Sequence, residues 1–147
     1  MKSVKIITIF LGLLFLCSCS PLEKKTDEEY SAAQEISAEQ LQHKWILYKI
    51  DGQLLTKKIT STLNISTKNK AAGTLVCNYF VGIIDLQKDQ LKINNMASTK
   101  KSCRSERGEI ETIISTVLNN YSQISLVEKQ LKLIGKSHHL LYKYQQN

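Results

Sequence analysis

The chain has few residues whose types and spacing could do chemistry, and the clearest pair is Cys77 and Cys103. They are the only cysteines outside the first twenty residues. In an oxidising compartment such a pair forms a disulfide, and closing its loop of about 27 residues stabilises a fold by roughly 3.5 kcal/mol. Two buried free thiols are the alternative. A redox switch is disfavoured because neither cysteine lies in a C-x-x-C motif, although Lys100, Lys101 and Arg104 would lower the pKa of an exposed Cys103 thiol.

The other candidate groups do not form a reactive constellation. His138 and His139 are adjacent in an expected strand, so their side chains point to opposite faces and cannot hold one metal together. Asp85, Asp89 and Glu109 occupy expected turn or solvent-facing helix positions. The chain has no G-x-S-x-G motif and no Gly-rich phosphate loop. The sequence therefore predicts no catalytic residue, no metal site and no cofactor, and the protein is not expected to be an enzyme.

Two polar residues close to the cysteines are predicted to have structural roles. Asn78 follows Cys77 directly, and Thr99 precedes Cys103 within the same polar stretch. Short polar side chains of this kind hydrogen-bond to the backbone of turns. We therefore expect Asn78 and Thr99 to make buried hydrogen bonds that fix the turns next to the cysteines.

The N-terminal residues predict export. Lys2 and Lys5 precede an apolar run at 6–16, which is shorter than the roughly 20 residues of a spanning helix and is typical of a signal peptide. A plain secretory signal and a lipoprotein signal are both compatible with this run.

The end of the run favours a lipoprotein. Residues 16–19 read Leu-Cys-Ser-Cys and resemble the lipobox, in which Leu and two small residues precede an acylated cysteine. The resemblance implies that 1–18 is a signal peptide and that Cys19 carries the acyl chains. Cys17 does not fit, because it lacks small residues before it. Ser20, rather than Asp, follows Cys19, which by the same resemblance implies an outer-membrane anchor with the domain facing the periplasm.

Charge divides the rest of the chain into two parts. Residues 20–41 carry 2 basic and 6 acidic residues, and residues 42–147 carry 16 basic and 7 acidic residues. We therefore expect a flexible acidic tether at 19–41 and a basic domain at 42–147. Nucleic acid is not an expected partner of an exported protein. The scatter of the lysines favours a solvated surface over a face for anionic lipid or lipopolysaccharide.

Short alternating segments predict an antiparallel sheet. The dipeptide Asp51-Gly52 is a strong hairpin signal. From Ser105 to Asn119 the apolar spacing instead predicts one amphipathic helix, with Ser105 as N-cap and a stop at Asn119-Asn120. The fold is thus expected to be mainly β with one helix (α+β). The predicted strands are 43–50, 59–66, 72–79, 81–86, 90–93, 121–127, 130–135 and 138–144.

The motifs around the two cysteines resemble those of a known family. C-N-x-F-x-G at 77–82, preceded by Gly73, is followed by A-S-T-x-x-x-C at 97–103. On these motifs, in this order and at this spacing, residues 37–143 resemble the META domain family, and within it the HslJ-like heat-shock lipoproteins of the enterobacterial outer membrane. The resemblance implies a small closed or cracked antiparallel barrel of about eight strands with an inserted helix. It also implies structural roles for Gly73, Asn78, Phe80, Gly82 and Thr99.

The function implied by the resemblance is a non-enzymatic role in envelope stress and in tolerance of hydrophobic antibiotics such as novobiocin. A monomer that contacts the membrane through the acyl chains on Cys19 is expected. The alternatives are a carrier of a small lipid or apolar ligand and a pilotin-like chaperone of an outer-membrane secretin. Against the carrier, the side chains expected inside the barrel are bulky enough to fill it: Trp45, Leu47, Leu63, Ile65, Leu91, Ile93, Ile124, Leu126, Leu131, Leu133 and Leu141.

Overall fold

The computed structural model describes residues 35–145. The predicted signal peptide at 1–18, the lipidation site Cys19 and most of the tether lie outside this range and stay predictions. Ala33–Asn147 forms a compact unit by itself. No helix within 35–145 is long and apolar enough to cross a membrane.

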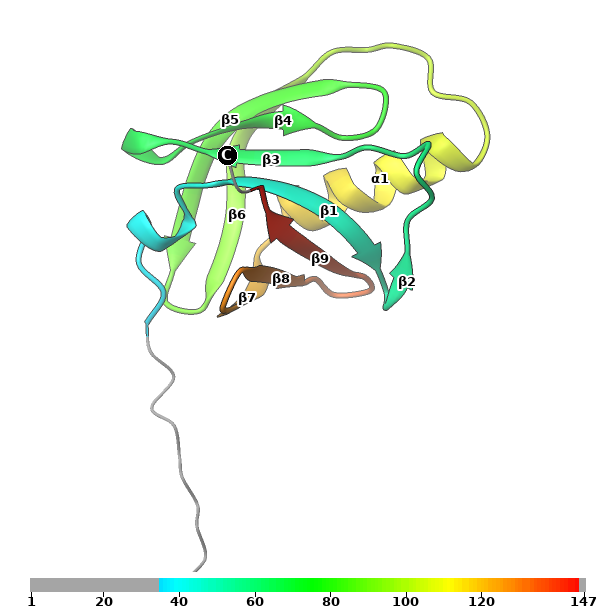
Figure 1. Ribbon diagram of the computed structural model, residues 1–147. Coiled ribbons are helices and arrows are strands. Elements are labelled where there is room, and N and C mark those ends of the chain that lie inside the picture. Colours follow the sequence, from blue (N-terminus) through cyan, green and yellow to red (C-terminus); the bar gives the residue numbers. More distant parts are fainter. Residues whose placement is uncertain (1–34, 146–147) are drawn as a thin grey trace, which may run out of the picture. The chain divides into compact units, whose positions relative to one another are not determined.

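The described residues form one antiparallel sheet of nine strands and one α-helix (Figure 1). The strands are β1 (Lys44–Ile50), β2 (Gln53–Leu54), β3 (Thr62–Ile65), β4 (Lys70–Thr74), β5 (Tyr79–Gln87), β6 (Gln90–Ser98), β7 (Ser122–Val127), β8 (Gln130–Ile134) and β9 (His139–Tyr144). The helix is α1 (Glu106–Asn119), and two 3-10 turns are η1 (Glu39–Leu41) and η2 (Thr67–Asn69).

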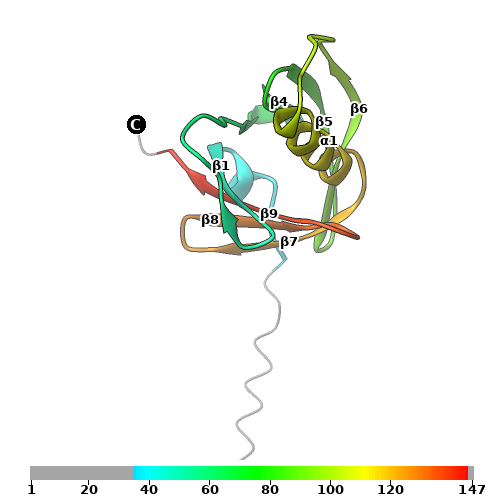
Figure 2. The ribbon, with the colours of Figure 1, turned by 90° about the vertical axis from the view of Figure 1, so that its right-hand side faces the viewer.

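Pairing between β1 and β9 closes the sheet into a barrel. Among the pairings that close the barrel, the shortest is between β6 and β7, which share the pairs Gln90–Gln123 and Leu91–Ser122. α1 connects these two strands in the sequence and packs against β6 and β9 (Figure 2). The prediction of a small antiparallel barrel with one inserted helix is therefore confirmed.

The β1–β2 connection is a tight hairpin, as the Asp51-Gly52 signal predicts. Asp51 has φ 50° and Gly52 has φ 81°, and Ile50 pairs with Gln53. Two successive positive φ values match the twist of the adjoining strands, and glycine adopts the second without strain.

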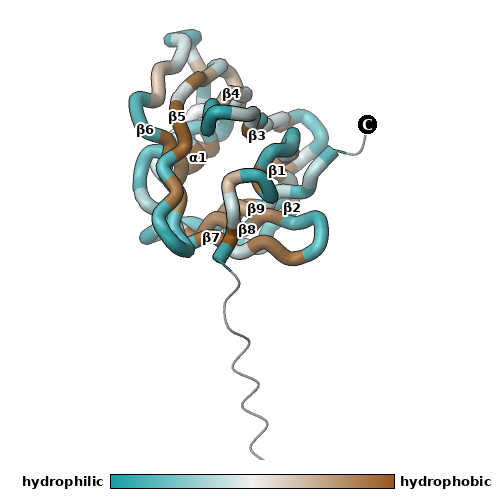
Figure 3. The backbone as a smooth tube through the Cα atoms, turned by 90° about the vertical axis from the view of Figure 1, so that its left-hand side faces the viewer, coloured by the Kyte–Doolittle hydropathy of each residue, from teal (hydrophilic) through white to brown (hydrophobic). Residues whose placement is uncertain are grey.

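The interior of the barrel is filled with side chains. Trp45 and Tyr142 are 1% and 0% exposed, and the Trp45 indole N–H donates to the Leu41 carbonyl at 2.9 Å. The Tyr142 hydroxyl has no hydrogen-bond partner among the described protein groups, and burial raises its pKa above the usual value. In Figure 3 hydrophobic colour follows much of the strands, as expected for a barrel with an apolar core.

One predicted interior residue in the last strand was wrong. Leu141 is only half-buried, and its neighbours Leu140 and Tyr142 point inward instead. Leu140, Leu141 and Tyr142 are consecutive apolar residues, so the alternation of the strand allows either Leu141 or its two neighbours to point inward. Pairing with β8 does determine it, because Tyr142 lies opposite Leu131 and Leu140 opposite Leu133. Leu126 also differs from the expectation, because it is half-buried at the edge of the core.

The predicted break between the third and fourth strands was misplaced. β4 ends at Thr74, residues 75–78 form a loop, and β5 then runs without interruption through Phe80 and Gly82. Leu75 and Val76 look like strand residues because they are apolar, but they enter the core from this loop. β6 is also longer than predicted, because it continues to Ser98 beside β5.

Ser105 precedes the helix as predicted, but it does not cap it through its side chain. It has φ 52° and makes no side-chain capping hydrogen bond. Its carbonyl instead accepts hydrogen bonds from the amides of Gly108 and Glu109. The helix ends at Asn119, where the asparagine pair predicted a stop.

Candidate functional site

The two cysteines meet between two loops. Cys77 lies between β4 and β5, and Cys103 lies between β6 and α1; their Cα atoms are 5.8 Å apart and their sulfur atoms are bonded. The predicted disulfide is confirmed, and the alternative of free thiols does not apply to this structure. The crosslink ties the start of β5 to the segment that leads into the helix.

A residue that the sequence reasoning missed, Glu111, completes this site. Its Oε2 atom accepts hydrogen bonds from three consecutive backbone amides, those of Val76 at 3.1 Å, Cys77 at 2.6 Å and Asn78 at 3.0 Å. Successive amides that point to one place form a concave anion-binding nest. Here a carboxylate of the protein itself occupies the nest and joins α1 to the loop that carries Cys77.

Asn78 connects the same loop to the segment before Cys103. Asn78 is buried, with 6% of the residue exposed. Its Oδ1 atom accepts from the Thr99 hydroxyl at 2.8 Å and from the Lys101 amide at 2.6 Å, while Nδ2 donates to the Lys101 carbonyl at 3.2 Å and to Glu111 Oε1. All hydrogen-bonding groups of the Asn78 amide side chain are therefore used. Thr99 in turn accepts a hydrogen bond from the Tyr79 amide at 3.2 Å. The predicted turn-fixing hydrogen bonds are present for both residues, but only Asn78 is buried, because Thr99 lies on the exposed segment after β6.

Two opposing effects determine the charge of Glu111. Burial raises the pKa of the carboxyl group, whereas hydrogen bonds from the Asn78 side chain and the three backbone amides lower it. The hydrogen bonds prevail, and the pKa lies below its usual value. Glu111 is thus ionised at neutral pH and balances the partial positive charge of the nest.

The chemistry of this cluster is structural. Ligand atoms of Cys77, Cys103 and Glu111 lie within 4.8 Å of one another, but the sulfur atoms are bonded to each other and supply no thiolate. The Glu111 carboxylate accepts four hydrogen bonds from the chain. It therefore has little capacity left to act as a metal ligand or as a general base.

A signal for Glu111 was present in the sequence. Ile114 and Leu118 are fully buried on α1, and Glu111 lies three residues before the first and seven before the second. These spacings place an acidic residue on the apolar face of the helix. An acid at such a position requires hydrogen-bond donors from another segment.

The remaining motif residues lie where β3, β4 and β5 pack closely. Phe80 is 2% exposed and lies opposite Gly73 in the sheet. A Cβ atom on Gly73 would overlap the Thr62 carbonyl, and one on Gly82 would overlap the Ile93 side chain. Gly82 also lies at a register shift between β5 and β6. Both glycines therefore permit close approach of the neighbouring strands.

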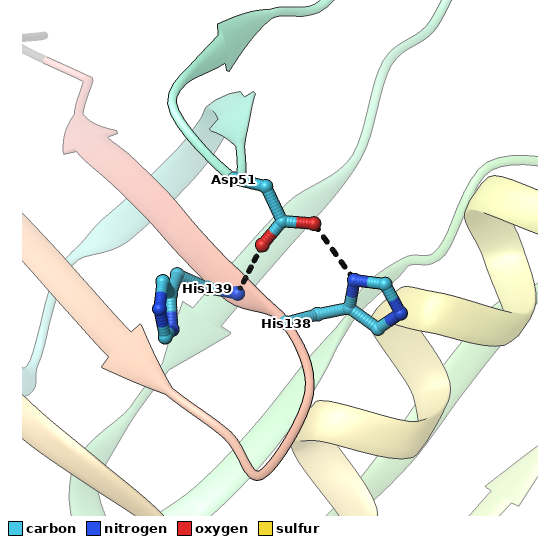
Figure 4. A network of polar contacts seen from close by, with 3 residues as sticks. All are labelled: Asp51, His138 and His139. Atoms are coloured by element: carbon cyan, nitrogen blue, oxygen red, sulfur yellow. Dashed lines mark hydrogen bonds and ion pairs between the residues drawn. The ribbon is translucent and has the colours of Figure 1, made fainter.

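The two histidines belong to a second polar cluster. Figure 4 shows their rings on opposite sides of the chain, with Asp51 between His138 and the backbone of His139. Asp51 Oδ2 lies 2.7 Å from His138 Nδ1, and Oδ1 accepts from the His139 amide at 2.7 Å. The hydrogen bonds from His138 and then His139 lower the pKa of Asp51. The cluster ties the β1–β2 turn to the β8–β9 turn.

A surface pocket of about 410 Å³ lies beside this second cluster. It is lined by Thr116 in the last turn of α1, by Asn120 directly after the helix, and by Ser137 and His138 of the β8–β9 turn. His138 and Asp51 are 37% and 42% exposed. Solvent competes with their interaction, so its contribution to stability is small.

Comparisons with known proteins place the chain in a family. The model of the META domain matches residues 38–147. One protein with an NMR structure is 28% identical with a TM-score of 0.65, over 74% of this chain and 95% of that chain. An NMR structure of a protein from Burkholderia xenovorans shares the fold with a TM-score of 0.58 and 21% identity, over 84% of this chain and 99% of that chain. A comparison with curated proteins gave no significant match. Because the family model covers most of the chain, the protein belongs to the META domain family.

Proposed function

We propose that this protein is a non-enzymatic, lipid-anchored envelope protein of the HslJ-like type. In this proposal, acyl chains on Cys19 hold it in the outer membrane, and the barrel faces the periplasm. Its role is in envelope stress and in tolerance of hydrophobic antibiotics such as novobiocin. The observation that carries the proposal is the Cys77–Cys103 disulfide, because structural disulfides persist in oxidising compartments outside the cytoplasm.

The site described above supports a scaffold rather than a reaction. Its carboxylate and amide groups are used in hydrogen bonds within the chain, and its two thiols are joined. The filled interior gives no support to the alternative of a carrier, because Trp45 and Tyr142 occupy the space that a ligand would need.

The lipid anchor can be tested by labelling growing cells of a bacterial expression host with a palmitate analogue. We expect the wild-type chain to be labelled and to fractionate with the outer membrane, and the Cys19→Ser variant to lose the label. Cys17→Ser is the matched control, since it changes the neighbouring cysteine and should keep the label. Label retained in Cys19→Ser would contradict the assigned anchor.

The proposed role is tested in the bacterium that naturally produces the protein. A strain that lacks the protein should become more sensitive to novobiocin, and the wild-type gene should restore tolerance. The Cys19→Ser variant, made at the same level, should restore less. Unchanged sensitivity of the deletion strain under envelope stress would exclude the proposed role and leave the anchor as a separate result.

A further inference from the structure

The outer face of the barrel carries an apolar stripe along β5. Tyr79, Val81 and Ile83 are 59%, 58% and 50% exposed. They alternate with inward-pointing residues such as Phe80 and Ile84, which are 2% and 5% exposed. The stripe is thus the solvent side of a strand whose other side is core, and it exposes three large apolar side chains in sequence.

Cross-strand pairing shows what surrounds this stripe. Val81 lies opposite Ala72 in β4 and Ala97 in β6, and directly opposite residues point to the same face of a sheet. Both neighbours are alanines, so they are too short to cover Val81. Next to Val81 and Tyr79 the surface has a shallow hollow of about 360 Å³, which reaches across β4 to β1.

Three lysines border the same face. Lys70 lies opposite Ile83. Lys44 lies in the same cross-strand row as Val81, because Val81 pairs with Ala72, Ala72 with Asn64, and Asn64 with Lys44. Lys101 Nζ lies 5.3 Å from the centre of the Tyr79 ring. We call Tyr79, Val81 and Ile83 together with Lys44, Lys70 and Lys101 the β5 patch.

Acidic residues do not offset these lysines. Among the outward positions of β1 and β3 to β6, the acidic residue is Asp85. Asp85 accepts hydrogen bonds from Tyr121 and Asn94, both at 2.8 Å, and it lies opposite Lys92. Within residues 35–145, no ion pair joins Lys44, Lys70 or Lys101 to an acidic side chain.

We propose that the β5 patch docks on an anionic lipid surface. Its apolar side chains would enter the interface between headgroups and acyl chains, with Tyr79 at the depth that tyrosines favour. The stems of the lysines would lie along this layer while their ammonium groups contact lipid phosphates. A second copy of the chain fits less well, because it would bring the same lysines face to face.

The proposal rests on the proposed lipid anchor for the biological membrane, but its chemistry lies in the domain. Fifteen residues separate Cys19 from Glu35, the first described residue, and a chain of this length spans at most about 55 Å. An anchored domain would therefore remain close enough to its bilayer for one face to bind. The lysines are scattered in the sequence, and the fold brings Lys44 of β1, Lys70 of β4 and Lys101 of the segment before α1 to one apolar stripe.

The test uses residues 33–147 without acyl chains, because this unit contains the complete barrel and the disulfide. Sedimentation with vesicles of equal parts phosphatidylglycerol and phosphatidylcholine should show binding at low salt. Binding should weaken at high salt because screening shortens the reach of the lysine charges. Vesicles of phosphatidylcholine alone should bind much less.

Two variants of the patch should weaken binding. Lys44→Gln with Lys70→Gln should lower affinity about 25-fold, at about fivefold for each lysine. Val81→Ser with Ile83→Ser should lower it about tenfold through lost apolar burial. These side chains are exposed, so the thermal unfolding temperature should change little and can be measured to verify folding.

Matched variants elsewhere on the barrel provide the controls. Val127 is 63% exposed at the end of β7, and Lys132 and Lys143 are exposed on β8 and β9. Val127→Ser, and Lys132→Gln with Lys143→Gln, should bind as the wild type does. An equal loss in the lysine controls would show that net charge alone acts and would overturn the proposal.

Two further outcomes would also overturn it. One is equal binding to both kinds of vesicle, and the other is absence of vesicle binding with retention on an acidic protein, which would make the patch a protein-docking site. The palmitate experiment on Cys19 gives its result independently, because it uses the full chain and does not depend on the β5 patch.

Discussion

Glu111 shows how a single side chain can organise two loops. One oxygen of its carboxylate accepts hydrogen bonds from three consecutive backbone amides of the loop that carries Cys77. The second oxygen accepts a hydrogen bond from the Asn78 side chain. Hydrogen bonds to a charged acceptor are stronger than neutral ones. The loop at 75–78 therefore keeps its shape although it contains two apolar residues that favour a strand.

We predict that Glu111→Gln lowers the free energy of unfolding by about 2–4 kcal/mol, because three amides lose a charged acceptor. Urea denaturation of the oxidised protein at neutral pH measures this difference. Glu109→Gln is the matched control on the same helix, since Glu109 is exposed, and it should change stability little. A loss below the error of the measurement would show that the nest does not need the charge.

The same residue predicts a dependence on pH. The pKa of Glu111 lies below its usual value of 4.5, so the stabilisation is complete above that pH and is lost as the pH falls through the lower value of the folded protein. The difference between wild type and Glu111→Gln should therefore shrink on acidification. A constant difference between neutral and acid pH would contradict this assignment.

At the scale of elements, the disulfide and the hydrogen bonds act on the same three segments. They join the β4–β5 loop, the segment before the helix and α1 itself. α1 lies next to the junction of β6 and β7, where only two residue pairs connect the strands. Fixing the start of the helix therefore supports the barrel at the shortest strand pairing of its closed ring.

We expect the Cys77→Ala, Cys103→Ala double variant to be destabilised by about 3.5 kcal/mol, from the loop that the disulfide closes. The fold should persist, because Glu111 and Asn78 still connect the same segments. Denaturant titration measures the loss in the free energy of unfolding, and far-UV circular dichroism measures whether the fold persists. A double variant as stable as the wild type would show that the crosslink adds nothing to the hydrogen bonds.

For the molecule as a whole, the barrel is a filled scaffold whose distinctive features lie on its surface. Fully buried aromatic and aliphatic side chains occupy the centre. The pocket beside His138 and the hollow next to the β5 patch are both on the outside. Binding is therefore expected at the surface.

Native mass spectrometry of residues 33–147 tests whether the barrel interior holds a ligand. We expect the mass of the bare polypeptide with one disulfide after purification from cells. A bound lipid or other apolar molecule that survives desalting would instead support a carrier. Such a result would require the interior side chains to move apart, because they leave no room for a ligand in the structure described.

Local patterns in the sequence determined much of this protein. Alternating apolar residues indicated the strands, and a change to helical spacing indicated α1, because side-chain direction repeats every two residues in a strand and every 3.6 in a helix. The motifs around the cysteines indicated the META domain. The positions of Asn78 and Thr99 beside the cysteines suggested a fixed pair of turns.

Only the tertiary structure decided which segments meet. Contacts between residues far apart in the chain determine three features that the sequence does not show. They are the loop at 75–78 between β4 and β5, the inward direction of Leu140 and Tyr142, and the hydrogen-bond partners of Asp51. An apolar run fits more than one phase, and a lone acidic residue does not reveal its donors. The two cysteines of the disulfide could be predicted from the sequence. The amide nest beside them, which binds the Glu111 carboxylate, forms only when the fold brings α1 and both loops together.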